Sequence, residues 1–322
     1  MIMIEITDEI LEQAVEREKA DQKKFQKRTD FFIKFFIVLC MLEVLPLITL
    51  VFRLGLIKGA AWDLLIILAD IIILFLGVTY ILGTHFKFFS LKRTLRSFSD
   101  TKFHKEVKNS DTDRQIKLWE ERFESLKDDI TKVFSASSLL SLYIRMDMSE
   151  KADKLFEWVK AYKPSNDLER ESITEIMLSY YDYKNDGESY VKLFENEEDL
   201  LIRQMWESPR VLLKIGFLAK YVSYLEWKKD YAKVIEVYGY YGRLLNMAAE
   251  TDISIAEMLD SHIKYGSLTY AKVYCQKGDI EKAAECFKDA MAKYDDSDFP
   301  SIKKYYAETK QLLDEAGAVY SE

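Results

Sequence analysis

The sequence predicts an all-α protein in which a two-helix transmembrane hairpin precedes a stack of antiparallel helix pairs. Two apolar runs, residues 35–52 and 64–82, each contain a single charged side chain. A helix rises about 1.5 Å per residue, so each run spans about 27–28 Å, close to the ~30 Å hydrocarbon core of a bilayer. From residue 114 onward the helical pattern continues almost to the end. Only 4 Pro and 11 Gly occur in 322 residues, which is typical of a largely helical chain.

The chain divides into four expected regions. Residues 1–30 form an amphipathic cytoplasmic segment, and residues 31–83 form the transmembrane hairpin. Residues 84–113 form a basic juxtamembrane segment and linker, and residues 114–322 form a cytoplasmic domain of helical repeats.

Basic residues indicate the orientation of the hairpin, because such residues near the ends of a span stay in the cytoplasm. Both termini are therefore expected in the cytoplasm, and residues 55–61 outside. A composition rich in Lys, Tyr and Phe favours a bacterial plasma membrane. The basic residues after the second span either bind anionic lipid head groups or form an ordinary cytoplasmic flank. The basic residues on the two sides are Lys23, Lys24, Lys27 and Arg28, then Lys87, Lys92, Arg93 and Arg96.

Two carboxylates lie within the predicted spans, Glu43 in the first and Asp70 in the second. A carboxylate at the bilayer centre costs about 2.5–3.5 kcal/mol on insertion scales, so each needs a reason to be there. Both lie at similar depth, while Arg53 and Asp63 lie near the outer surface. These four residues are candidates for docking a membrane partner or for homo-oligomer formation. The alternative is an oligomeric channel or a proton-coupled subunit.

The rest of the composition excludes several function classes. The net charge is −8, and most of the acidic excess lies in residues 101–322, which argues against nucleic-acid binding. The three cysteines, Cys40, Cys275 and Cys286, are too few for a disulfide framework. No HExxH, GxGxxG, GxxxxGK[ST] or GxSxG motif is present. We therefore expect no catalytic residues, no cofactor and no metal.

The segment Ser267–Met291 has the pattern of two short helices that pack through small residues. The matching residues are Ala271, Tyr274, Gly278, Ala283, Phe287 and Ala290. The segment resembles a tetratricopeptide repeat (TPR). The same template fits three earlier segments less well, which implies a TPR-like α-solenoid with turns at Ser149, Gly187, Lys229 and Gly278. The turns lie further apart than the about 34 residues of a regular array. A last helix over residues 302–316 is expected to cap the stack.

Tyrosine and tryptophan gather in the third repeat-like unit. Tyr224, Trp227, Tyr240 and Tyr241 either form a peptide-binding surface or fill the space between helices. The resemblance to TPR domains implies binding of a protein or peptide, so we expect a membrane-tethered scaffold or adaptor. Besides the channel, a peptide-sensing regulator is the other alternative.

Overall fold

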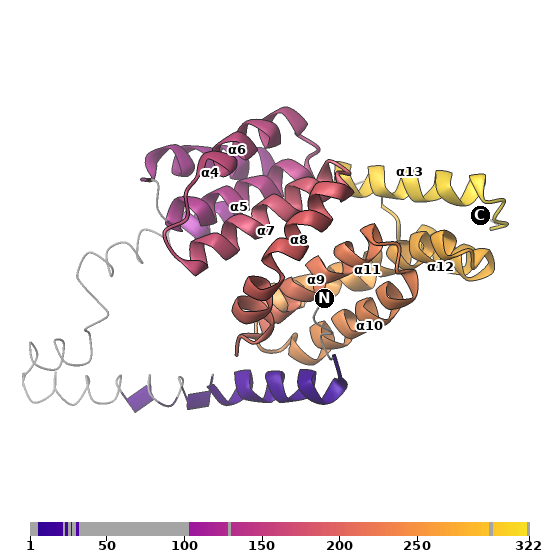
Figure 1. Ribbon diagram of the computed structural model, residues 1–322, viewed down its shortest axis with the longest axis horizontal. Coiled ribbons are helices and arrows are strands. Elements are labelled where there is room, and N and C mark those ends of the chain that lie inside the picture. Colours follow the sequence, from indigo (N-terminus) through magenta and orange to yellow (C-terminus); the bar gives the residue numbers. More distant parts are fainter. Residues whose placement is uncertain are drawn as a thin grey trace, which may run out of the picture. The chain divides into compact units, whose positions relative to one another are not determined.

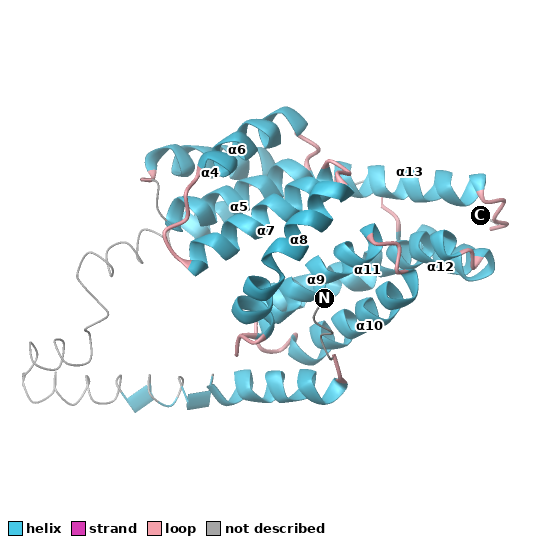
Figure 2. Ribbon diagram, in the orientation of Figure 1, coloured by secondary structure: helices cyan, strands magenta, loops and turns pink. Residues whose placement is uncertain are grey.

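The computed structural model describes residues 6–21, 23–24, 27, 30–31, 103–127, 130–295 and 299–320. Within these residues all regular structure is helical (Figure 2), which confirms the all-α class for this part of the chain. The predicted spans, residues 35–52 and 64–82, lie outside the described residues. Among the helices that are described, none combines the length and the apolar character needed to cross a bilayer.

The chain forms two compact units. One consists of residues 1–20 together with residues 112–322, and we call it the helical unit; the other consists of residues 21–111. The helical unit contains the labelled helices of Figure 1. They are α4 (Thr112–Ser125), α5 (Ile130–Arg145), α6 (Ser149–Ala161), α7 (Asp167–Tyr183), α8 (Gly187–Leu201), α9 (Val211–Trp227), α10 (Tyr231–Ala248), α11 (Ile253–Lys277), α12 (Ile280–Lys293) and α13 (Pro300–Glu315). A short π-helix without a label in the figure, η1 (Ile202–Trp206), follows α8.

Helices α5 to α12 form four consecutive pairs, and each pair turns in the same way. One residue per turn has a positive φ, between 52° and 89°. The amide of the next residue donates to the carbonyl five positions earlier, at 2.8–3.0 Å. This is the Schellman ending of a helix. The positive-φ residues are Asp147, Asn185, Lys229 and Gly278, at or within two residues of the predicted turns.

Aspartates start three of the four second helices. Asp186, Asp230 and Asp279 each accept a hydrogen bond from the backbone amide three residues ahead, which satisfies a free amide of the first turn. The first pair differs. The N-cap of α6 is Met148, whose side chain makes no capping hydrogen bond. The Ser149 hydroxyl accepts a hydrogen bond from Lys184.

The shared turn geometry predicts opposite changes of stability for substitutions at Lys229 and Gly278. Lys229 adopts φ 60° and Gly278 φ 89°, and a left-handed conformation costs an L-residue other than glycine about 1 kcal/mol. Lys229→Gly should therefore raise the free energy of unfolding by about 0.5–1 kcal/mol, and Gly278→Ala should lower it by about 1 kcal/mol. Urea denaturation followed by circular dichroism measures both. If both substitutions raised the free energy of unfolding, or both lowered it, this explanation of the turns would be wrong.

The pair α11–α12 packs through the residues that carry the TPR resemblance. Ala271, Ala283 and Phe287 have no exposed surface, and Ala290 is 5% exposed. They share an apolar cluster with Leu313 of α13, and Tyr274 packs at its edge. Small residues where two helices cross let the backbones approach closely, so α12 lies tightly against α11.

The first residues of the chain belong to the helical unit. Helical residues 8–21 bury Leu11, Ala14 and Val15 in the apolar cluster that contains α8, α9 and α10. Asp8 forms an ion pair with Arg243 of α10 at 2.7 Å. The segment predicted as residues 1–30 is therefore divided by the structure: its first 20 residues group with residues 112–322.

Candidate functional site

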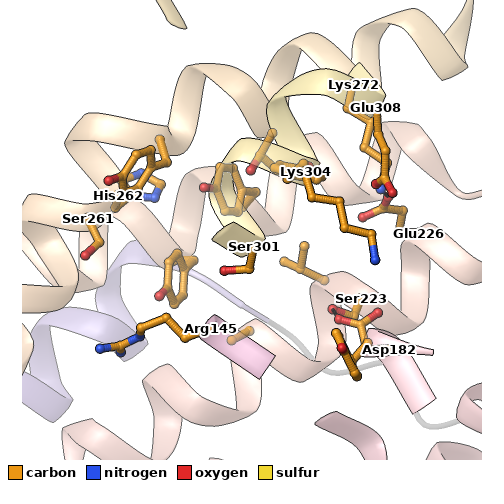
Figure 3. Close-up of a pocket in the computed structure, with 18 of the residues that line it drawn as sticks. Arg145, Asp182, Ser223, Glu226, Ser261, His262, Lys272, Ser301, Lys304 and Glu308 are labelled. Atoms are coloured by element: carbon orange, nitrogen blue, oxygen red, sulfur yellow. Dashed lines mark hydrogen bonds and ion pairs between the residues drawn. The ribbon is translucent and has the colours of Figure 1, made fainter. Parts of the chain in front are cut away.

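A cavity of about 710 Å³ lies on the side of the helical unit that the first helices of the pairs form. Its walls come from the end of α5, from α7, α9 and α11, and from two tyrosines of α10, and the N-terminal half of α13 also contributes (Figure 3). Its volume falls within the range of ligand-binding pockets, about 300–1,000 Å³. It is the candidate site of this protein.

One wall of the cavity is aromatic. Tyr238 and Tyr241 of α10 stack with their ring centroids 5.8 Å apart, and the His262 ring of α11 lies 4.8 Å from Tyr238. A Cβ atom on Gly242 would overlap the His262 ring, so this glycine lets the imidazole lie against α10. Burial lowers the pKa of His262, which favours the neutral ring. Its Nδ1 atom is buried and has no hydrogen-bond partner among the described residues.

A second wall carries an ion pair between α9 and α11. The Lys272 ammonium bonds to the Glu226 carboxylate and lies 5.2 Å from the centroid of the Tyr305 ring. Burial alone would lower the pKa of Lys272, but Tyr305 and Glu226 outweigh it and hold that pKa above its usual range. This lysine is therefore charged at neutral pH, and its charge is matched by Glu226.

Trp227 lies at the edge of the cavity and joins two helix pairs. Its indole Nε1 donates to Asp182 of α7 at 3.0 Å, and the Ser223 hydroxyl donates to the other oxygen of Asp182 at 3.3 Å. A Cβ atom on Gly187 would overlap the indole ring. The glycine at the start of α8 thus makes the space that Trp227 of α9 fills.

The four predicted peptide-binding aromatics lie in different places. Trp227 and Tyr241 line the cavity. Tyr224 is 4% exposed and stacks on Phe194 at 4.5 Å, so it belongs to the core. Tyr240 lies outside the lining of the cavity, with its ring 4.4 Å from the Arg243 guanidinium.

The N-terminal half of α13 crosses the cavity to the α5–α6 turn. The Arg145 guanidinium lies 4.8 Å from the Phe299 ring, and the Lys304 ammonium lies 3.5 Å from the Asp147 carboxylate. The Lys304 and Asp147 side chains are 48% and 39% exposed. An exposed ion pair contributes at most about 1 kcal/mol, and an exposed cation–π contact about 0.5–1 kcal/mol. These two contacts of α13 with the first helix pair are therefore weak.

Sequence reasoning missed most of the cavity. His262 and Lys272 are single residues without a motif, and Asp147 and Lys304 are 157 positions apart. Of these residues, Asp147 alone could be related to a local feature, because it has the positive φ of a helix end. The contacts of α13 with Arg145 and Asp147 join residues that are distant in the chain, and no sequence pattern predicts them.

The remaining predicted site residues lie elsewhere. The hairpin residues Glu43, Arg53, Asp63 and Asp70, and the flanking Lys87, Lys92, Arg93 and Arg96, lie outside the described residues. Cys275 and Cys286 are free thiols, and burial raises the pKa of both. Within the described ranges, no group of three or more His, Cys, Asp or Glu side chains is arranged to hold a metal ion.

No protein-family model, no curated protein and no solved structure matches this chain. The resemblance to TPR repeats thus rests on the residues of the chain itself, most closely on those of Ser267–Met291.

Proposed function

We propose that this chain is a membrane-tethered interaction module that binds a protein or peptide segment in the cavity of its helical unit. The apolar runs at residues 35–52 and 64–82 are long enough to form the tether. Their basic flanks favour the cytoplasmic side for both termini and for the helical unit, and the composition favours a bacterial plasma membrane.

The observation that carries the binding function is the cavity. It combines aromatic rings, which anchor interfaces well, with charged groups from helices that are distant in sequence. Stacked helix pairs form extended binding surfaces in repeat proteins. The TPR-like pattern of α11 and α12 implies the same use, because such domains bind segments of other proteins.

Photocrosslinking from two positions of α11 tests this proposal. Met258 lines the cavity and is 38% exposed, whereas Ile263 is 57% exposed and lies outside the cavity lining. The full chain, with a photoreactive amino acid at one of these positions, is expressed in the source cells and irradiated in the isolated membrane fraction. We expect a specific protein adduct from position 258 that is absent from position 263.

The outcome has two parts. Recovery of the chain in the membrane fraction supports the tether, and its recovery in the supernatant counts against it. Equal adducts from positions 258 and 263, or none from position 258, would contradict binding in the cavity. Because Ile263 is more exposed than Met258, simple accessibility predicts the opposite order of yields.

A further inference from the structure

Helix α13 has two halves with different surroundings. The C-terminal half is anchored in the apolar cluster of α11 and α12: Leu313 and Thr309 are at most 1% exposed, and the Tyr306 ring lies 5.1 Å from the Phe287 ring. The N-terminal end differs: Tyr305 still packs at the edge of this cluster, whereas residues 299–304 reach across the cavity through Phe299 and Lys304. We call residues 299–304 the strap.

The strap reaches the first helix pair through two side chains. Phe299 packs under the Arg145 guanidinium. Lys304 extends into the cavity (Figure 3), where its ammonium lies 3.5 Å from Asp147 and 5.8 Å from the centroid of the Tyr183 ring. The Tyr183 hydroxyl donates to the same Asp147 carboxylate at 2.8 Å. An aromatic and a cationic side chain, five positions apart, thus occupy two neighbouring subsites.

Without the strap, the cavity walls are acidic. Lys272 already neutralises Glu226, which leaves Arg145 as the other cation of these described walls beside Asp147, Asp182 and Glu257. The remaining carboxylates of the walls outnumber their cations, and the only cation that the strap brings to them is Lys304. The walls outside α13 contain Arg145, Asp147, Asp182, Glu226, Glu257 and Lys272.

We propose that the strap is an internal pseudo-ligand, and that the external ligand is a peptide segment that takes its place. Such a segment presents an aromatic residue to Arg145 and, five positions later, a lysine or arginine to Asp147. This inference rests on the proposed function and adds the chemistry of the partner to it. The charge of the walls selects a cation, and the ring subsite selects an aromatic side chain.

The exchange needs no unfolding of the rest of α13. The buried side chains of its C-terminal half and Tyr305 remain in their cluster, while the exposed Phe299 and Lys304 leave the walls. The strap-closed form competes with the ligand, so the apparent affinity is reduced by the fraction of molecules whose cavity is closed. Weakening the strap therefore raises the affinity for an external segment.

A labelled peptide with the sequence of residues 299–310, FPSIKKYYAETK, serves as the probe. Its binding to the purified full chain in detergent is measured by fluorescence anisotropy. The strap variant is Phe299→Ala with Lys304→Ala, and the matched control is Lys303→Ala, an exposed lysine of the same turn. A third chain adds Asp147→Asn to the strap variant. Asparagine accepts the positive φ of this position, so the turn keeps its conformation.

We expect the strap variant to bind the probe at least about fivefold more tightly than the wild type or Lys303→Ala. Asp147→Asn should reverse this gain, and a probe with glutamate in place of its second lysine should not bind. Equal affinity of all chains, no saturable binding to any of them, or no effect of Asp147→Asn would overturn the inference. An adduct from position 258 together with any of these results would reject the pseudo-ligand and leave the proposed function standing.

Discussion

Replacement of Phe287 by alanine is expected to lower the free energy of unfolding by about 3–5 kcal/mol. Phe287 has no exposed surface and lies between the Tyr306 ring at 5.1 Å and the Tyr320 ring at 4.9 Å. The substitution removes the ring that joins α12 to α13, and the fully packed surroundings cannot close the space. The loss should show as a lower urea midpoint of the purified chain.

Phe134→Ala is the matched control for this effect. Phe134 of α5 is 50% exposed, so the same chemical change leaves no buried cavity and should cost less than about 1 kcal/mol. Losses of similar size in the two variants would contradict the assignment of Phe287 to the core of the last repeat.

Glu171→Gln should make the helical unit more stable at pH 8 and leave it almost unchanged below pH 5. Glu171 is 4% exposed on α7, and burial, together with the neighbouring Glu175 carboxylate, raises its pKa to about 7. Burial also raises the pKa of Glu175, against the opposing charge of Lys220 on α9. Both side chains therefore take up a proton more readily than a free glutamate.

The sign of this pH dependence follows from proton linkage. Between pH 4.5, the value of a free glutamate, and about pH 7, the native chain binds more protons at Glu171 than the unfolded chain. The contribution of Glu171 to stability is therefore complete below pH 4.5 and is lost as the pH rises through 7. Glutamine mimics the protonated carboxyl at every pH. The free energy of unfolding of the variant at pH 8 should therefore exceed that of the wild type by on the order of 2–3 kcal/mol.

Thermal unfolding of both chains at pH 5 and pH 8 measures this difference. Glu121→Gln, on the exposed side of α4, makes the same change of charge without burial and should not alter the pH dependence. The burial argument fails if Glu171→Gln shifts the melting temperature equally at both pH values, or if Glu121→Gln has the same effect.

The turns between helices were predictable because the interactions that form them are local. The Schellman bond joins residues five positions apart, and the aspartate caps act over three. Gly278 and the dipeptide Asp186–Gly187 are therefore visible in the sequence. Lys229 carries no such signal of its own, yet the repeat pattern places a turn there, and its φ is 60°.

The aromatic residues of the third pair show where prediction from sequence ends. Tyr224 and Tyr241 have the same side chain, and both lie on helices with apolar neighbours. Tyr224 is stacked in the core on Phe194 of α8, whereas Tyr241 faces the cavity beside His262 of α11. The two tyrosines differ in the helix that packs against each: α8 against Tyr224 and α11 against Tyr241. Which helix packs against a residue is decided by the tertiary structure.

The sequence by itself determined the helical class of the described residues, the four turns, and the small residues that bring α11 and α12 together. These features depend on backbone geometry and on side chains a few positions apart. Only the tertiary structure decided that residues 8–21 pack beside α9 and α10, that Trp227 fills the space above Gly187, and that the strap of α13 crosses a cavity to Asp147. Such contacts join residues tens to hundreds of positions apart, and their energy exists only once the intervening helices have stacked.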